Sequence, residues 1–283
     1  MQNRYACDVG DFMKLGLLRQ LAAPAGDGGS GMRMGLNWYL GPDEAHNGDG
    51  KHIAYLDPSN GMHRSLAGCD RDLIERLARV VAVERSVAAL DRSGTLPPGS
   101  RTHSEMLAPS AGLVGRRAWH RRALDALAGA DVVCADPDNG IRPAAAAPKL
   151  HKYALLEEMA DYARRGQSLV VYQHADRSAD ARTQAARRLE QLSDGVGQPP
   201  VAAIIARRGS CRFFLITGTD GHRDRLAAAL ESFADRWSPH AELVGGVPGR
   251  RGGDSNPRTR STPVTRFPVA PVQPLRHLSR WAT

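Results

Sequence analysis

One short stretch near the middle of the chain concentrates side chains that could do chemistry. An apolar run, 132–135, ends at two carboxylates, an amide, a proline and a glycine, in the order Asp136, Pro137, Asp138, Asn139, Gly140. Proline, asparagine and glycine suit a tight turn, because proline presets φ and the other two tolerate positive φ. A turn does not account for Asp136, since a carboxylate at the exit of an apolar strand is unfavourable unless it is solvated or paired. The sequence therefore favours a functional corner over a simple turn.

Two further polar segments also follow apolar runs. The segment 41–52 comes after the run 32–40 and is rich in acidic residues and histidine, and His174, Asp176 and Arg177 follow the run 168–173. In open α/β sheets, ligands bind at the carboxyl ends of the parallel strands. We therefore expect the three polar segments to meet in one pocket. His174 fits either a catalytic histidine or a hydrogen-bonded structural one.

The elements that must position these residues alternate between helices and strands. Helical periodicity or helix-start and helix-stop residues mark 11–23, 70–94 (one helix or two), 116–129, 149–166, 178–195 and 220–234, and strands are expected at 32–40, 53–56, 131–135 and 168–174. The segment 201–217 holds two apolar runs joined by only four residues, so they must pair as an antiparallel hairpin. This order predicts an α/β fold: a Rossmann-like three-layer sandwich whose mostly parallel sheet carries an antiparallel C-terminal edge hairpin.

The charge of the chain is concentrated at one end. The formal net charge is +8, but 249–283 contains seven arginines and one aspartate, which leaves only +2 for 1–248. We interpret 1–248 as a single Rossmann-like domain. The segment 249–283 reads as a basic, Pro/Arg-rich disordered tail, because it has no apolar period, although a basic arm that grips phosphates is the alternative. Residues 254–257 can be encoded by the complement of a tRNA T-arm, which suggests a reading frame that enters a tRNA gene beside a mobile element.

Several classes of protein do not fit the composition. No apolar run approaches the roughly 20 residues of a membrane span, and the N-terminal residues do not form a secretory signal. The four cysteines are scattered without the spacing of a zinc site or disulfide frame: Cys7, Cys69, Cys134 and Cys211. These features predict a cytoplasmic protein with reduced cysteines and no membrane partner. The oligomeric state is left open.

Two motifs resemble known methyltransferases. The strand that ends in Asp136-Pro137, followed by a helix, a strand, a helix and an antiparallel hairpin, resembles the second half of class I S-adenosylmethionine-dependent methyltransferases. Members that methylate amines carry Asp/Asn-Pro-Pro-Tyr/Phe at this corner. The N-terminal segment is also similar to the Gly-Asn/Asp-Phe-Ala-Asp…Lys opening of bacterial 23S rRNA adenine-N6 methyltransferases, with matches at Gly10, Asp11, Phe12 and Lys14.

A broader likeness covers most of 2–245. It is to a family of bacterial and phage proteins with Gly-Asp-Phe-x-Lys near the start, Asn-Trp-Tyr-Leu with Pro-Asp-Glu, a central Asp-Pro-Asp-Asn-Gly and Gly-Gln-Ser-Leu-x-x-Tyr-x-His. That likeness carries no activity by itself.

The methyltransferase resemblance implies roles for named residues. Asp136 would accept a hydrogen bond from an amine, for example on a nucleic acid, and the carbonyl of Pro137 would help to hold that amine. Lys14, Asn37 and Asp57 would hold S-adenosylmethionine, with Asp57 on the cofactor ribose.

The corner also departs from the methyltransferase pattern. Asp138 and Asn139 replace the proline and the aromatic residue that would stack on a flipped base. Trp38 or Tyr39 could supply the missing ring, although strand aromatics of this kind more often belong to the core.

Two other functions remain open. A Mg²⁺-dependent hydrolase or nuclease could use carboxylate, amide and imidazole ligands from the set Asp136, Asp138, Asn139, Asp43, Asp49 and His174. The spacing of His46, Asp49 and His52 matches no strong metal motif, so no metal ligands are assigned. A non-catalytic Rossmann-like partner protein is the other alternative.

Overall fold

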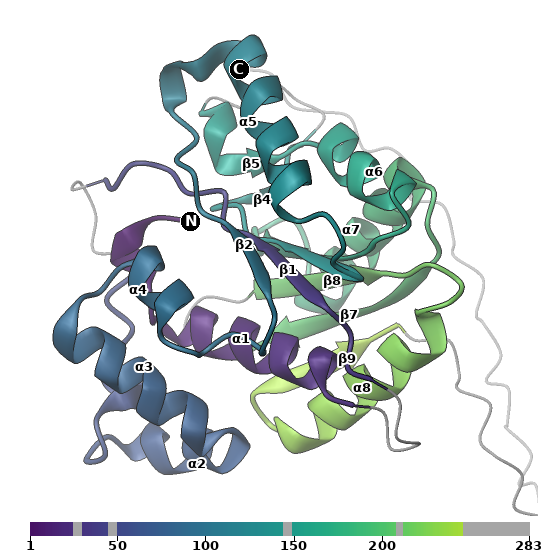
Figure 1. The fold of residues 1–283 in the computed structure, drawn as a ribbon. Helices are drawn as coiled ribbons and strands as arrows, with labels where there is room; N and C mark the ends of the chain where they lie inside the picture. Colours follow the sequence, from purple (N-terminus) through teal and green to yellow (C-terminus); the bar gives the residue numbers. More distant parts are fainter. Residues whose placement is uncertain (25–29, 45–49, 144–148, 208–211, 246–283) are drawn as a thin grey trace, which may run out of the picture. The chain divides into compact units, whose positions relative to one another are not determined.

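A seven-stranded mixed sheet forms the centre of the protein (Figure 1). Its strands are β1 (Met34–Asn37), β2 (Arg101–His103), β3 (Val132–Ala135), β6 (Ser168–His174), β7 (Pro200–Ala206), β8 (Arg212–Thr217) and β9 (Ala241–Val244). In space they follow the order β2-β1-β3-β6-β8-β7-β9. The pairs β1–β2, β1–β3 and β3–β6 are parallel, whereas β8 runs antiparallel to both of its neighbours and β9 runs antiparallel to β7.

The computed structural model describes residues 1–24, 30–44, 50–143, 149–207 and 212–245. All of them belong to one compact unit, Met1–Gly249. The tail expected at 249–283 lies outside the described residues, as does the loop expected to join β7 and β8. No helix within the described ranges is long and apolar enough to cross a membrane.

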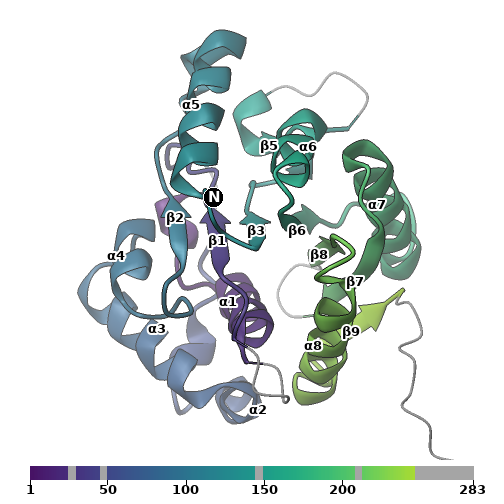
Figure 2. The same ribbon diagram turned by 45° about the vertical axis from the view of Figure 1, so that its right-hand side comes forward.

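Helices cover both faces of the sheet (Figures 1 and 2). One face carries α1 (Val9–Ala22) and α8 (Arg223–Arg236), and three more helices pack beside α1: α2 (Gly61–Cys69), α3 (Arg71–Val83) and α4 (Val87–Arg92). The other face carries α5 (Gly112–Ala126), α6 (Leu156–Arg164) and α7 (Ala181–Val196). The Rossmann-like three-layer α/β sandwich expected from the sequence is therefore confirmed.

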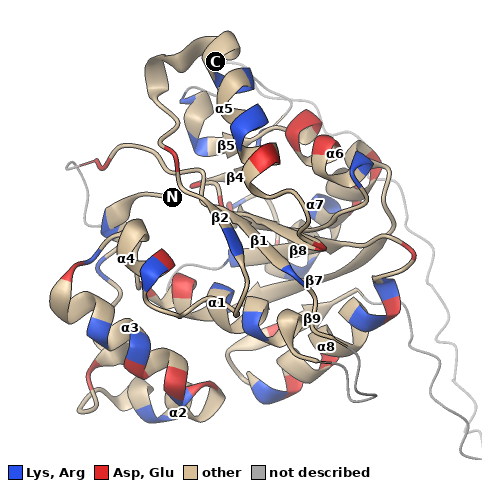
Figure 3. Cartoon of the chain, in the orientation of Figure 1, with Lys and Arg blue, Asp and Glu red and all other residues tan. Residues whose placement is uncertain are grey.

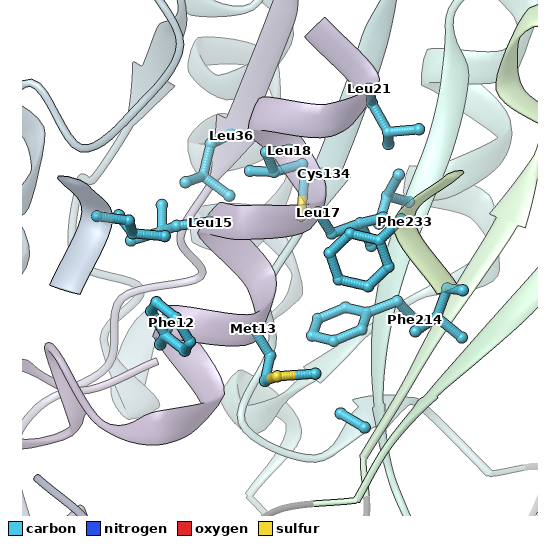
Figure 4. Close-up of a cluster of buried hydrophobic side chains, with 14 of the residues drawn as sticks. Phe12, Met13, Leu15, Leu17, Leu18, Leu21, Leu36, Cys134, Phe214 and Phe233 are labelled. Atoms are coloured by element: carbon cyan, nitrogen blue, oxygen red, sulfur yellow. The ribbon is translucent and has the colours of Figure 1, made fainter. Parts of the chain in front are cut away.

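Side chains of the central strands alternate between two apolar cores. In β3, Val132 and Cys134 belong to the core under α1, whereas Val133 and Ala135 belong to the core under α5, α6 and α7. This alternation is the two-residue period of a strand that is buried on both faces. Figure 4 shows the first core, in which Leu17 and Met13 of α1 lie toward Phe233 and Phe214, whereas Leu15 and Phe12 lie on the other side of the helix.

The helix α1 is buried over most of its length because it is enclosed by the sheet, α3 and α8. It begins at Asp8, whose carboxylate accepts hydrogen bonds from the backbone N–H groups of Gly10 and Asp11. This N-cap supplies partners for two of the backbone donors that a helix start leaves open. The cap thereby fixes where the side chains of the first turn lie.

The hairpin predicted for 201–217 is antiparallel, as expected. In detail, β8 is inserted between β6 and β7, and the antiparallel strand at the edge is β9, which the sequence analysis did not find.

The prediction of a strand at 53–56 is wrong. The segment is the 3₁₀ helix η2 (Ala54–Leu56), because the buried ring of Tyr55 packs against Phe12 in α1 instead of entering the sheet. The parallel neighbour of β1 is the three-residue strand β2.

Other boundaries differ from the expected ones. The segment 70–94 forms two helices, α3 and α4, and α2 was not expected. The helix expected from 149 begins only at Leu156, because the 3₁₀ helix η4 (Leu150–Lys152) and the strand β5 (Tyr153–Ala154) precede it. Strand β5 pairs in parallel with β4 (Gly140–Ile141), so this insertion folds back on the corner after β3.

The contact between α1 and α8 depends on a glycine. A Cβ atom at Gly16 would lie 2.1 Å from Cζ2 of Trp237, whereas a Cβ at Gly68 in α2 would meet nothing within 4 Å. We expect Gly16→Ala to lower the free energy of unfolding by about 1–3 kcal/mol through overpacking. Gly68→Ala should raise it by up to about 1 kcal/mol through helix propensity. Urea denaturation of both variants measures the two signs, and an unchanged Gly16→Ala would contradict the close packing of α1 on Trp237.

Candidate functional site

A cavity of about 390 Å³ lies at the carboxyl edge of the parallel strands. Its walls come from the ends of β3 and β6, the start of β8, the first turns of α1, the segment after β1, and η4 with the residue before it. Pockets that bind small molecules usually have volumes of about 300–1,000 Å³. The cavity is therefore large enough for a ligand of modest size.

Most of the residues proposed from the sequence meet in this cavity. Six of them line it: Lys14, Asp136, Pro137, Asp138, Asn139 and His174. They converge because β3 and β6 are parallel neighbours, so that the residues following both strands emerge at the same edge. The loop after β1 also reaches this edge, as expected, because its residues Glu44 and His52 line the cavity.

The two other proposed cofactor residues lie elsewhere. Asn37 is fully buried, donates a hydrogen bond to the hydroxyl of Tyr162 at 3.1 Å and shares another with His103 at 3.2 Å. Asp57 is exposed at the end of η2 and accepts hydrogen bonds from Ser59. Neither side chain lines the cavity.

A buried ion triad forms the floor of the site. The ammonium of Lys14 donates to Oδ1 of Asp11 at 2.8 Å and to Oδ2 of Asp136 at 2.6 Å. It also lies 4.5 Å from the centroid of the Trp38 ring, a cation–π contact. Burial by itself would lower the pKa of Lys14, but the two carboxylates outweigh it and raise that pKa. Lys14 is therefore held as a cation.

Asp136 keeps one carboxylate oxygen for other partners. Its Oδ2 is held by Lys14, and no hydrogen bond to Oδ1 occurs within the described part of the chain. Burial raises the pKa of Asp136, and the ammonium of Lys14 opposes part of that rise. The carbonyl of Pro137 likewise accepts no hydrogen bond from the described residues.

Asp138 is held by different cations. Its Oδ1 lies 2.5 Å from the amino group of Met1, and its Oδ2 accepts a hydrogen bond from Gln2 at 2.9 Å. Lys152 approaches to 3.6 Å. Burial would raise the pKa of Asp138, but the Met1 amino group and the Gln2 amide hold it below its usual range. The ion pair of Asp136 is thus with Lys14, whereas Asp138 pairs with the Met1 amino group and Lys152.

Arg212 completes the site and was missed by sequence analysis. Its guanidinium donates to Oδ2 of Asp8 at 3.0 Å and lies over the first turn of α1, where a Cβ at Gly10 would come within 2.6 Å of it. It also interacts with Tyr172, whose pKa burial raises to about 12. Because β8 runs antiparallel, its first residue lies at the edge where the parallel strands end. The predicted hairpin could have indicated this position, because the first residue of an antiparallel strand lies beside the last residues of its parallel neighbours.

The aromatic residues after β1 do not open into the cavity. Trp38 is fully buried and donates from Nε1 to Asp91 at 2.8 Å, and the hydroxyl of Tyr39 donates to Glu158 at 2.9 Å. The rings that line the cavity belong instead to Tyr5 and Tyr172.

Unusual backbone conformations gather at the site. The non-glycine residues with positive φ in the described ranges are Cys7, Tyr39 and Lys149, at 63°, 44° and 61°. Lys149 lines the cavity, Cys7 precedes the N-cap of α1, and the carbonyl of Tyr39 accepts from the amino group of Met1. Such conformations concentrate at functional sites, because the surrounding structure must hold them in place.

The turn after β3 combines both roles considered for it. Gly140 has a φ of 97°, and a Cβ there would lie 2.4 Å from Oε1 of Gln173. Glycine is therefore required by the turn itself, whereas Asp136 and Asp138 belong to the cavity.

Four of the residues considered for a metal site line the cavity, Asp136, Asp138, Asn139 and His174, but they do not form a cluster of metal ligands. The described ranges contain no group of three or more His, Cys, Asp or Glu side chains that could hold a metal ion. Asp43 does not line the cavity and accepts a hydrogen bond from the backbone of Arg4. His46 and Asp49 lie outside the described residues. The three described cysteines are buried and free.

Comparison with family models and with curated proteins finds no match to this chain.

Removing the central cation tests the triad. We expect Lys14→Met to lower the free energy of unfolding by about 3–5 kcal/mol, because two buried carboxylates lose their partner. Arg33→Met is the matched control: it removes a cation that pairs with Asp131 at the surface, where a loss below about 1 kcal/mol is expected. Adding Asp11→Asn to Lys14→Met should restore part of the stability. Equal small losses in denaturant titrations of Lys14→Met and Arg33→Met would show that the triad is not tightly buried.

Proposed function

We propose that the cavity binds S-adenosylmethionine and that Asp136 positions an amine, on a nucleic-acid base, for methyl transfer. The observation that supports this most directly is the state of Asp136. Its carboxylate stands at the carboxyl end of β3, lines the cavity, and has one oxygen fixed by Lys14 while the other has no hydrogen-bond donor among the described residues.

A primary amine needs two acceptors if its lone pair is to point in a fixed direction. Oδ1 of Asp136 and the carbonyl oxygen of Pro137 are adjacent in the chain, and each can accept one N–H. With the cofactor bound, the nitrogen lone pair would form the new N–C bond while the methyl–sulfur bond breaks and its electron pair stays on sulfur as a neutral thioether, and the proton lost from the amine would pass to water at the cavity mouth. The charge of Asp136 stabilises the positive charge that develops on the nitrogen. Lys14 keeps the carboxylate in one orientation throughout.

The lining also suits the proposed cofactor. It combines the cationic side chain of Arg212, the carboxylates of Asp8 and Asp11, and the ring of Tyr5, which together match a zwitterionic amino acid joined to an adenosine. When bound, this cofactor supplies an electrophilic methyl group. Asp8 and Asp11 line the cavity, a position that Asp57 does not share, and they are held there by Arg212 and Lys14.

The topology gives further support. The β3–α6–β6–α7 succession followed by the antiparallel pair β7–β8 agrees with the order on which the methyltransferase resemblance rests. The corner still lacks the usual aromatic residue, since Asn139 stands there, and the tyrosine rings in the cavity lining are those of Tyr5 and Tyr172.

Calorimetric titration of the full chain with S-adenosylmethionine in chelator tests the proposal. We expect binding to survive in Asp136→Asn, while transfer of labelled methyl groups to total RNA or denatured DNA falls by about 10²–10³-fold, as for the loss of one preorganised charge-stabilising group. Asp57→Asn is the matched control, because the same change outside the cavity should leave both binding and transfer unaltered.

Two results would contradict the proposal. One is the absence of cofactor binding in the wild-type chain. The other is binding of Mg²⁺ without cofactor that is lost in Asp138→Asn, which would favour the hydrolase instead.

A further inference from the structure

Glu44 is surrounded by positive groups at the rim of the cavity. Its carboxylate lies 2.5 Å from Nζ of Lys152, 3.1 Å from Nζ of Lys149 and 4.0 Å from the guanidinium of Arg4. The amide of Gln2 donates to it at 3.5 Å. We call Lys149, Lys152 and Arg4 the cation ring. Glu44 thus faces three cations, and Asp138, 3.6 Å from Lys152, is a second carboxylate beside the ring, so the three cations outnumber the two carboxylates.

The composition of the chain makes the two lysines of this ring informative. The sequence contains 34 arginines but only four lysines, and three of the four line the cavity: Lys14, Lys149 and Lys152. Lysine differs from arginine in carrying a compact ammonium with three donors on a flexible stem. Such a group can follow a phosphate oxygen without a fixed planar geometry. Lysine is therefore concentrated in the lining of the cavity.

The cation ring lies beside the corner after β3. Lys152 is within 3.6 Å of Asp138, in the same corner as Asp136, so the ring flanks the acceptor proposed for the amine. Charges of both signs are otherwise scattered over the outer helices (Figure 3). The ring is thus a local feature and does not reflect the net charge of the chain.

We propose that the cation ring is a phosphate subsite for a nucleic-acid strand, and that Glu44 occupies it as an internal anion until a phosphodiester displaces it. This inference rests on the proposed function, because it states how the nucleic acid would be held beside Asp136. Displacement exchanges two pairs for contacts of the same ammonium groups with a phosphate: the pair with Lys149, which is 55% exposed and contributes little, and the pair with Lys152, which is 11% exposed. The hydrogen bonds from the lysines, led by Lys152, lower the pKa of Glu44 to about 2, so at physiological pH it leaves by competition and not by protonation.

This arrangement predicts opposite effects for changes at neighbouring positions. Removing the charge of Glu44 frees the ring and strengthens binding of a polyanion. Removing Lys149 or Lys152 weakens binding of the polyanion. It also makes the affinity less dependent on salt, because fewer counterions are released from the strand. If the ion pairs of Glu44 were purely structural, removing its charge would not strengthen binding of a polyanion.

Fluorescence anisotropy with a labelled single-stranded RNA and the full chain, without cofactor, measures these effects. We expect Glu44→Gln to tighten binding about fivefold, the equivalent of about 1 kcal/mol. Lys149→Ala and Lys152→Ala should each weaken it by a similar factor and reduce the slope of log affinity against log salt by about 0.7. Lys152→Arg, which keeps the charge, should retain most of the affinity.

Matched controls separate the site from net charge. Glu242 is also held by two cations, Arg182 and Arg207, and is 20% exposed against 18% for Glu44, but it does not line the cavity. Glu242→Gln should leave the affinity unchanged, and so should Arg33→Ala at the opposite edge of the sheet. An equal gain from Glu44→Gln and Glu242→Gln would overturn the subsite.

The remaining outcomes distinguish the ligand and the two proposals. If inorganic phosphate at the same concentration as the RNA abolishes RNA binding, the ring does not bind a nucleic-acid strand. The ring would then be assigned to a small phosphate ester. The expected signs without any binding of S-adenosylmethionine would support the subsite and contradict methyl transfer. Cofactor binding with no effect of Glu44→Gln on RNA affinity would leave methyl transfer in place and overturn the subsite.

Discussion

The buried ammonium of Lys14 between two carboxylates is the interaction on which the site depends. Burying a charge is unfavourable unless it is paired, and here the pairing joins elements that are far apart in the sequence. Asp11 belongs to the first turn of α1, whereas Asp136 follows β3, so the triad fixes the helix start against the strand end. The same contact that holds the layers in register also orients the carboxylate that faces the cavity. Stability and the proposed chemistry therefore depend on one side chain.

Much of this arrangement could be predicted from the sequence because parallel strands impose it. Once the runs ending near Asn37, Asp136 and His174 were recognised as strands, their polar successors had to share one edge of the sheet. The antiparallel hairpin was equally determined, since four residues cannot carry a parallel crossover. The corner after β3 was recognisable for the same kind of reason: turn chemistry explains Gly140 but not the carboxylate of Asp136.

The rest depends on tertiary contacts that leave little trace in local patterns. Strand β2 has three residues, too few for a period, whereas 53–56 looked like a strand and folds as η2 because Tyr55 is needed in the core beside α1. The assignment of Asp57 to the ribose rested on that expected strand. Arg212 lay in an apolar run whose direction had to be known before its place at the site could be seen. The scarcity of lysine is visible in the composition, but only the structure shows that three of the four lysines line one cavity.

The pairing of Asp8 with Arg212 has a consequence for the order in which the protein forms. One oxygen of Asp8 caps α1 locally and can do so as soon as the first turn exists, but the other accepts from a residue 204 positions further along the chain. A growing polypeptide releases its N-terminal elements first. During synthesis, the start of α1 therefore emerges long before the arginine that covers it, and the cavity closes only when β8 enters the sheet between β6 and β7. The pocket can therefore be completed only after the chain has been translated as far as β8.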